Sequence, residues 1–107
     1  MANTYTNAKI DLTTTNVTTL YTCAALTTSI VKSILVSEDS GNADTITVTL
    51  TTAAGAVFSL FKTKTIGANA TVELLTTPLV VQAEEILKVN AATANRLHVV
   101  ASILEIT

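Results

Sequence analysis

The feature that most constrains this chain is the alternation of apolar and polar residues, which runs without a fault from Thr45 to Thr51. Ile46, Val48 and Leu50 fall on one side of an extended strand, and four threonines fall on the other. A period of two residues is the spacing of a strand with one buried face. The β-branched residues that favour strands are abundant, with 22 Thr, 11 Val and 8 Ile among 107 residues. The pattern predicts an antiparallel sheet whose threonine face meets water.

Similar alternating runs recur about every ten residues, with turn-forming residues between them. The expected strands are Ser29–Ser37, Ala56–Thr63, Thr71–Leu75, Glu85–Asn90 and Arg96–Ile106, with weaker candidates at Ala8–Thr13, Thr18–Cys23 and Leu79–Val81. Convincing helical spacing is absent from the sequence. We therefore predict an all-β fold, an antiparallel, jelly-roll-like β-sandwich of about eight short strands, although an immunoglobulin-like strand order fits the same pattern.

A single domain accommodates this pattern, because no linker, repeat or change of composition divides the chain. We expect residues 13–107 to form the β-sandwich domain. Residues 1–12 carry Asn and Thr where a strand would need an apolar face. They are therefore expected to form an N-terminal arm, which could add a strand to the open edge of a neighbouring subunit.

The expected strand Arg96–Ile106 is apolar on both faces. One face carries Leu97, Val99, Ala101 and Ile103, and the other carries Val100, Leu104 and Ile106 beside His98 and Ser102. One of these faces must fill the core. The second face is covered either by another part of the same chain or by a partner.

The strand Ser29–Ser37 is also apolar on both faces, with Ile30, Ile34 and Val36 expected on one side and Val31 and Leu35 on the other. Charged residues supply only 13% of the chain, so apolar surface must remain somewhere. We therefore expect a homo-oligomer or a component of a larger assembly. The candidate interface residues are Tyr5, Ile10, Leu12, Val100, Leu104 and Ile106.

The charge balance argues against several partners. Six basic residues are scattered against eight acidic ones, giving a formal net charge of −2. Such a chain presents no basic surface for nucleic acid or anionic lipid. No apolar run approaches the roughly 20 residues that span a bilayer. We expect no nucleic-acid and no membrane partner.

Residue types that carry chemistry are sparse. Cys23 is the sole cysteine and His98 the sole histidine, so a cysteine nucleophile would depend on this one pair. We expect Cys23 to be a buried, inert thiol and His98 to be a surface or interface residue. The chain also has too few ligands at close spacing for a zinc site. We expect no enzyme, no catalytic residue, no cofactor and no metal.

The carboxylates fall in two groups. Glu38, Asp39 and Asp44 lie with Asn42 in one loop, which could hold a hard cation but matches no EF-hand, so a solvated turn is the favoured interpretation. Glu84 and Glu85 are adjacent. Neighbouring residues of a strand face opposite ways, so this pair cannot bracket a glycosidic bond.

Three segments together resemble a class of small bacteriophage virion proteins that serve as head decoration or tail-associated β-modules. Residues 18–34 resemble an opening TxLYTxPAGxTxxVKSI, residues 42–48 a strand entry GxADTVTV, and residues 78–106 an ending PLVLxAGDTLKV…VHVxxSxxEI. Two turns depart from this pattern. Ala24-Ala25-Leu26 stands where the pattern has Pro-Ala-Gly, and Ala83-Glu84-Glu85 where it has Ala-Gly-Asp. The lost glycines call the geometry of both turns into question.

The resemblance implies a structural part of the phage particle, often a homotrimer, with no catalytic residues to carry over. We expect a capsid decoration or cement subunit on the particle surface that contacts the major capsid protein, with a trimer favoured. A tail or fibre-base module is the near alternative. A carbohydrate- or receptor-binding β-module is a third possibility, which needs exposed aromatic rings beside polar loops.

Overall fold

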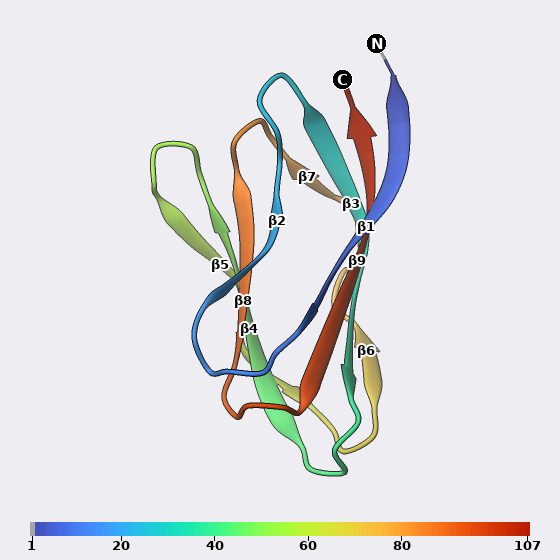
Figure 1. Cartoon of the computed structure of the whole chain (residues 1–107), viewed down its shortest axis with the longest axis vertical. Helices are drawn as coiled ribbons and strands as arrows, with labels where there is room; N and C mark the ends of the chain where they lie inside the picture. Colours follow the sequence, from blue (N-terminus) through green and yellow to red (C-terminus); the bar gives the residue numbers. More distant parts are fainter. Residues whose placement is uncertain (1) are drawn as a thin grey trace.

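The computed structural model describes residues 2–107, which form two antiparallel sheets packed face to face (Figure 1). The strands are β1 (Asn3–Asp11), β2 (Thr18–Thr22), β3 (Thr28–Glu38), β4 (Asp44–Thr51), β5 (Val57–Ile66), β6 (Thr71–Glu73), β7 (Leu79–Val81), β8 (Ile86–Ala91) and β9 (Leu97–Ile106). One sheet has the order β1-β9-β3-β6, with β7 also paired to β3, and the other has the order β2-β8-β4-β5. The predicted all-β sandwich is confirmed. Residues 2–107 include no helix that could span a membrane.

The strand order is that of a jelly roll. β6 and β7 pair with opposite ends of β3, so together they act as one interrupted strand and reduce the count to eight. Consecutive strands β1, β2, β3 and β4 alternate between the sheets, and β4 and β5 form a hairpin within one sheet. In the immunoglobulin order the first two strands share a sheet. Here β1 and β2 lie in opposite sheets, so of the two predicted strand orders the structure has the jelly roll.

The core is formed by the inward faces of both sheets. In β9 the residues Leu97, Val99, Ala101 and Ile103 are all buried, whereas the residues between them are partly or fully exposed, as the alternation predicts. Ile46 and Val48 of β4 face them from the other sheet and are fully buried. The threonine face of β4 lies on the outside of the sandwich, although Thr51 at its end is buried.

A β-bulge changes the faces of β3. The pairing with β9 shifts between Val31 and Ser33, so that Lys32 is an extra residue in the ladder. After such a bulge the alternation continues in the opposite phase. Val31, Ile34 and Val36 therefore share the core, and the predicted grouping of Ile30 with Ile34 and Val36 is wrong.

The segment expected as a loose arm is a strand of the sandwich. β1 pairs with β9 at every position from Asn3 to Asp11, and this ladder of backbone hydrogen bonds needs no apolar side chains. Leu12, expected at an interface, is only 1% exposed. Its N–H donates to Leu97 O at 3.0 Å and its carbonyl accepts from Asn95 N at 2.9 Å, which directs the side chain into the core.

The two turns that lack the glycine of the phage pattern keep a glycine-like backbone. Leu26 has φ of 62° and Glu84 has φ of 68°, both in the left-handed region that glycine occupies without strain. These are the two positions at which the pattern has Gly. The turn geometry questioned from the sequence is thus retained by non-glycine residues.

The acidic loop after β3 is not a solvated turn. Glu38 is 2% exposed, and its carboxylate accepts hydrogen bonds from Ser40 N at 2.8 Å, Gly41 N at 3.0 Å and Asn69 N at 3.0 Å, as well as from the Ser40 hydroxyl. Asp44 is also buried and accepts from Thr93 N at 3.1 Å. Glu38 thereby ties the β3–β4 loop to the β5–β6 loop at one end of the sandwich.

The hydrogen bonds to the Glu38 carboxylate predict that the stability of the fold depends on pH. Burial alone would raise the pKa of Glu38, but the hydrogen bonds from Ser40, Asn69 and Gly41 outweigh it and lower the pKa from 4.5 to about 2. A lowered folded-state pKa means that ionised Glu38 stabilises the fold at neutral pH and that this contribution is lost as the pH falls from 4.5 toward 2. Glu38→Gln should lower the thermal unfolding midpoint by several degrees at pH 7 and by much less near pH 2, as followed by circular dichroism. Glu84→Gln is the matched control, because it makes the same change at an exposed carboxylate. An equal deficit of Glu38→Gln at both pH values would contradict the prediction.

Candidate interaction surface

The side of the five-stranded sheet that faces away from the core carries a continuous apolar row. Tyr5 of β1 pairs with Leu104 of β9, Leu104 pairs with Ile30 of β3, and Ile30 pairs with Val80 of β7. Residues opposite one another in a ladder project from the same face of the sheet. Tyr5 is 73% exposed and Val80 51%, with half-buried Leu104 and Ile30 between them. The row therefore crosses four strands, and the side chains at its two ends are exposed to solvent.

A second, shorter row lies beside it. Val100 of β9 pairs with Leu35 of β3, and both side chains are exposed. Lys9 and Glu73 flank this pair on β1 and β6. We call the apolar residues of both rows the outer surface, comprising Tyr5, Ile30, Leu35, Val80, Val100 and Leu104.

Polar groups border the outer surface along β1. Two shallow grooves run there, one bordered by the polar side chains of Lys9, Asp11 and His98 and the other by Tyr5, Asn7, Lys32 and Ser102. The Lys32 ammonium lies 5.8 Å from the centre of the Tyr5 ring, within the range of a cation–π interaction. The bulge in β3 leaves Lys32 exposed beside this ring.

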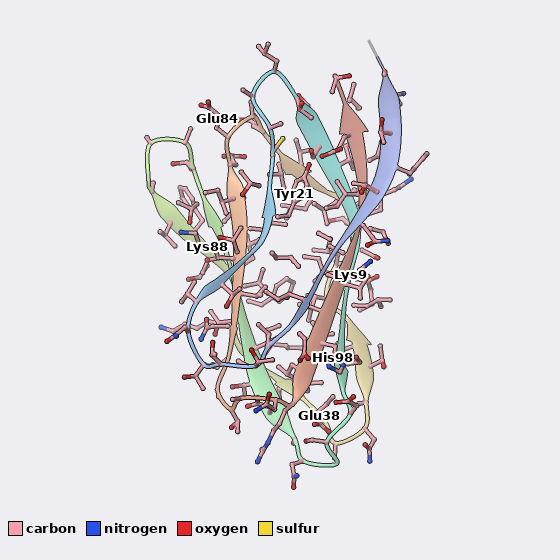
Figure 2. The ribbon with its side chains drawn as sticks, viewed as in Figure 1. Lys9, Tyr21, Glu38, Glu84, Lys88 and His98 are labelled. Atoms are coloured by element: carbon pink, nitrogen blue, oxygen red, sulfur yellow. The ribbon has the colours of Figure 1, made fainter. Side chains whose placement is uncertain are left out.

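His98 links three elements at one end of this face (Figure 2). Its Nε2 lies 3.2 Å from Asp11 of β1 and its Nδ1 lies 3.5 Å from Asp39, which follows β3. A neutral imidazole has one N–H, so both carboxylates receive a donor only when the ring is doubly protonated. The side chain is 42% exposed, which confirms the predicted surface position of His98.

The residues expected at an interface divide between the two faces. Tyr5, Val100, Leu104 and Ile106 lie on the outward side of the sheet, whereas Ile10 packs against the core and Leu12 belongs to it. Ile30, Leu35 and Val80 also belong to this surface, although the sequence did not predict them as interface residues. The faces of Ile30 and Leu35 depend on the bulge in β3, which the sequence pattern does not show. The face of Val80 depends on the pairing of β7 with β3, which the sequence pattern does not show either.

Tyr21, labelled in Figure 2, and Cys23 belong to a separate polar cluster between the sheets, in which both side chains contact the Ser29 hydroxyl. The Tyr21 hydroxyl donates to Glu105 Oε2 at 2.5 Å and lies 2.6 Å from Ser29 Oγ, so it connects β2 to both central strands of the other sheet. Cys23 is 1% exposed, as expected, and its thiol donates to Thr27 O at 3.3 Å. His98 lies seven positions before Glu105 on β9, about 23 Å away, so it cannot serve as a base for this thiol. The cluster therefore joins the two sheets.

No protein family matches the sequence, and no curated protein matches it significantly. Among solved structures, 98% of this chain aligns with a chain in "Structure of infectious bursal disease virus Gt strain", with a TM-score of 0.42 and 10% sequence identity. The alignment covers 30% of that viral chain. A likeness of this degree does not identify a function.

The inter-sheet cluster gives a stability prediction. Burial and the hydrogen bond to Glu105 raise the pKa of Tyr21, so its hydroxyl remains protonated as a donor. Tyr21→Phe removes this donor from a charged acceptor and should lower the free energy of unfolding by about 1–3 kcal/mol in urea titrations. Tyr5→Phe is the matched control, because that side chain is exposed. Equal losses in the two variants would contradict the assigned role of the Tyr21 hydroxyl.

Proposed function

We propose that this chain is a structural subunit of a virus particle, and more specifically a decoration or cement subunit on the surface of a phage head that contacts the major capsid protein. The observation that carries the proposal is the outer surface, an apolar face of a sheet that residues 2–107 leave uncovered. The proposed role requires no catalytic residue, cofactor or metal.

The outer surface suits durable attachment. Long-lived interfaces bury large areas with an apolar centre and few charges, and surround this centre with polar groups. Here the row from Tyr5 to Val80 supplies the apolar centre, and Lys9, Lys32 and Glu73 supply charged positions around it. Binding through this face would leave the core and the inter-sheet cluster unchanged.

Two further observations support a virion role. The jelly-roll order recurs in viral capsid domains, although also in lectins. The left-handed residues Leu26 and Glu84 occupy the glycine positions of the phage pattern, so the backbone is compatible with that resemblance at the two turns where the sequence departs from it. A tail or fibre-base module would use the same fold and face. Electron cryomicroscopy of the particle that carries this chain distinguishes the two placements.

The proposed attachment face is tested by charge insertion. The double variant Leu35→Lys/Val80→Lys places two cations among the exposed residues of the outer surface and should reduce particle occupancy at least about tenfold, because an unpaired buried charge costs several kcal/mol. Occupancy is measured by quantitative gel analysis of purified particles assembled with each variant.

The matched control is Thr22→Lys/Thr65→Lys, which changes two exposed threonines on the four-stranded sheet. It should leave occupancy unchanged, and both double variants should keep the wild-type circular dichroism spectrum. Full occupancy of the Leu35→Lys/Val80→Lys variant, or equal loss in the control, would refute attachment through the outer surface.

A carbohydrate-binding role is the second candidate, and the exposed Tyr5 ring favours it. Sugars stack on exposed aromatic rings while polar groups fix their hydroxyls. The groove beside Tyr5 offers the Asn7 amide, the Ser102 hydroxyl and the Lys32 ammonium for this purpose. Tyr21, the second of the two tyrosines, is instead hydrogen-bonded between the sheets.

This second candidate predicts glycan binding that depends on a single ring. Tyr5→Ala should abolish wild-type binding on a glycan array, whereas Phe58→Ala, which removes another exposed ring on β5, should retain it. Absence of wild-type binding to any glycan, or equal loss in both variants, would reject this role.

A further inference from the structure

The sandwich has one long sheet edge that is neither short nor bulged. Natural sheets protect their edges with short strands, bulges or charged side chains. Of these devices β1 carries two charged residues, Lys9 and Asp11. β6 and β7 have three residues each, β2 has five and a register shift, and β5 has two register shifts and a left-handed residue, Thr63, with φ of 49°. β1, by contrast, has nine residues paired to β9 without a shift.

The backbone of β1 determines which residues could accept another strand. Ala2 and Thr107 exchange backbone hydrogen bonds of 3.3 and 2.9 Å, and Leu12 N donates to Leu97 O at 3.0 Å. In an antiparallel ladder such bonded pairs alternate with pairs whose N–H and C=O groups point the other way. The even-numbered residues of β1 therefore bond to β9. The odd-numbered residues direct their backbone groups to the free edge, and all of them are exposed: Asn3, Tyr5, Asn7, Lys9 and Asp11.

We infer that two copies of this chain pair edge to edge through antiparallel β1 strands, about a two-fold axis at Asn7. Only a register that places odd residues opposite odd residues joins the outward backbone groups. An axis at Asn7 satisfies this condition and uses the whole strand from Asn3 to Asp11. Moving the axis by one residue in either direction keeps the pairing odd with odd but shortens the overlap.

The side chains of β1 are self-complementary in this register. Tyr5 lies opposite Lys9 of the second copy, an aromatic–cation pair, and Asn3 lies opposite Asp11 of the second copy, a donor–carboxylate pair. Each pair occurs twice because of the two-fold axis. Like charges are not opposed anywhere along the strand. Lys32 reaches Tyr5 from β3, on the opposite side of β1 from the second copy, so it does not obstruct the pairing.

The pairing joins two five-stranded sheets into one continuous sheet and places the outer surfaces of both copies on the same side. It is distinct from particle attachment, because the edge of β1 and the face of the sheet are different surfaces. A two-fold contact also gives a dimer, in contrast to the trimer that the phage resemblance implies. The occupant is a second copy, and strand addition by an unrelated extended peptide is an alternative outcome of the test.

Light scattering of the full chain tests the inference. We expect a species of twice the 11.2 kDa chain mass that becomes monomeric in Asn7→Pro, because proline removes an N–H that points to the free edge while the ladder to β9 keeps its donors. Asn7→Ala is the matched control, since it keeps the N–H and should remain dimeric. A wild-type monomer, a trimer, or a dimeric Asn7→Pro variant would overturn the inference.

A cysteine scan tests the register independently of proline tolerance. Asn7→Cys places two thiols on the axis, where bonded pairs have Cα atoms about 5.5 Å apart, within the range for a disulfide. Asn3→Cys places them about 27 Å apart. Oxidation should cross-link Asn7→Cys and leave Asn3→Cys monomeric on a denaturing gel, while buried Cys23 stays unreacted. Equal cross-linking of both variants would overturn the register, and a monomeric protein that still attaches to particles would refute the edge pairing alone.

Discussion

The antiparallel pairing of β3 with β9 is the interaction on which the rest of the structure depends. These two strands lie in the middle of the five-stranded sheet and pair over ten positions. Their inward residues, such as Val99 and Ile34, fill the core, and their outward residues, such as Val100 and Leu35, form the outer surface. Because side chains alternate along a strand, the burial of one set fixes the position of the other. The same pairing that builds the core therefore determines which side chains form the outer surface.

Regular strands were predictable because one local rule governs them. Alternation alone placed Val99 and Ala101 on one face and Val100 and Leu104 on the other, and the structure shows that the first pair fills the core. The bulge at Lys32 could not be predicted, since it depends on how β3 pairs with a strand more than sixty positions away. Only the second half of β1 was expected as a strand, within the weak candidate Ala8–Thr13, and its first half was missed for a related reason. Its pairing is made by backbone groups, which every residue carries, so its polar side chains gave no signal.

The loops show a second limit of sequence reasoning. Charge in a turn usually indicates solvent, yet Glu38 and Asp44 are buried because neighbouring backbone N–H groups need acceptors. Which N–H groups approach a carboxylate depends on the meeting of loops from distant parts of the chain, as with Glu38 and Asn69. At Leu26 and Glu84, residues that do not favour the left-handed region adopt it. Both residues lie in loops that connect the two sheets, and backbone hydrogen bonds join these loops, from Glu84 N to Cys23 O at 2.8 Å and from Cys23 N to Glu85 O at 2.9 Å.

Two different surfaces of one sheet are available to partners, and their chemistry differs. The outer surface offers apolar side chains, which bind through burial and tolerate many partners of complementary shape. The β1 edge offers backbone groups in a fixed direction and spacing, which accept only an extended strand in the right register. A subunit that uses its edge for a second copy keeps its face free for a different protein. Since both surfaces meet at Tyr5, which belongs to the apolar row and to the edge strand, this residue is where contact with a second copy and contact with a particle would influence each other.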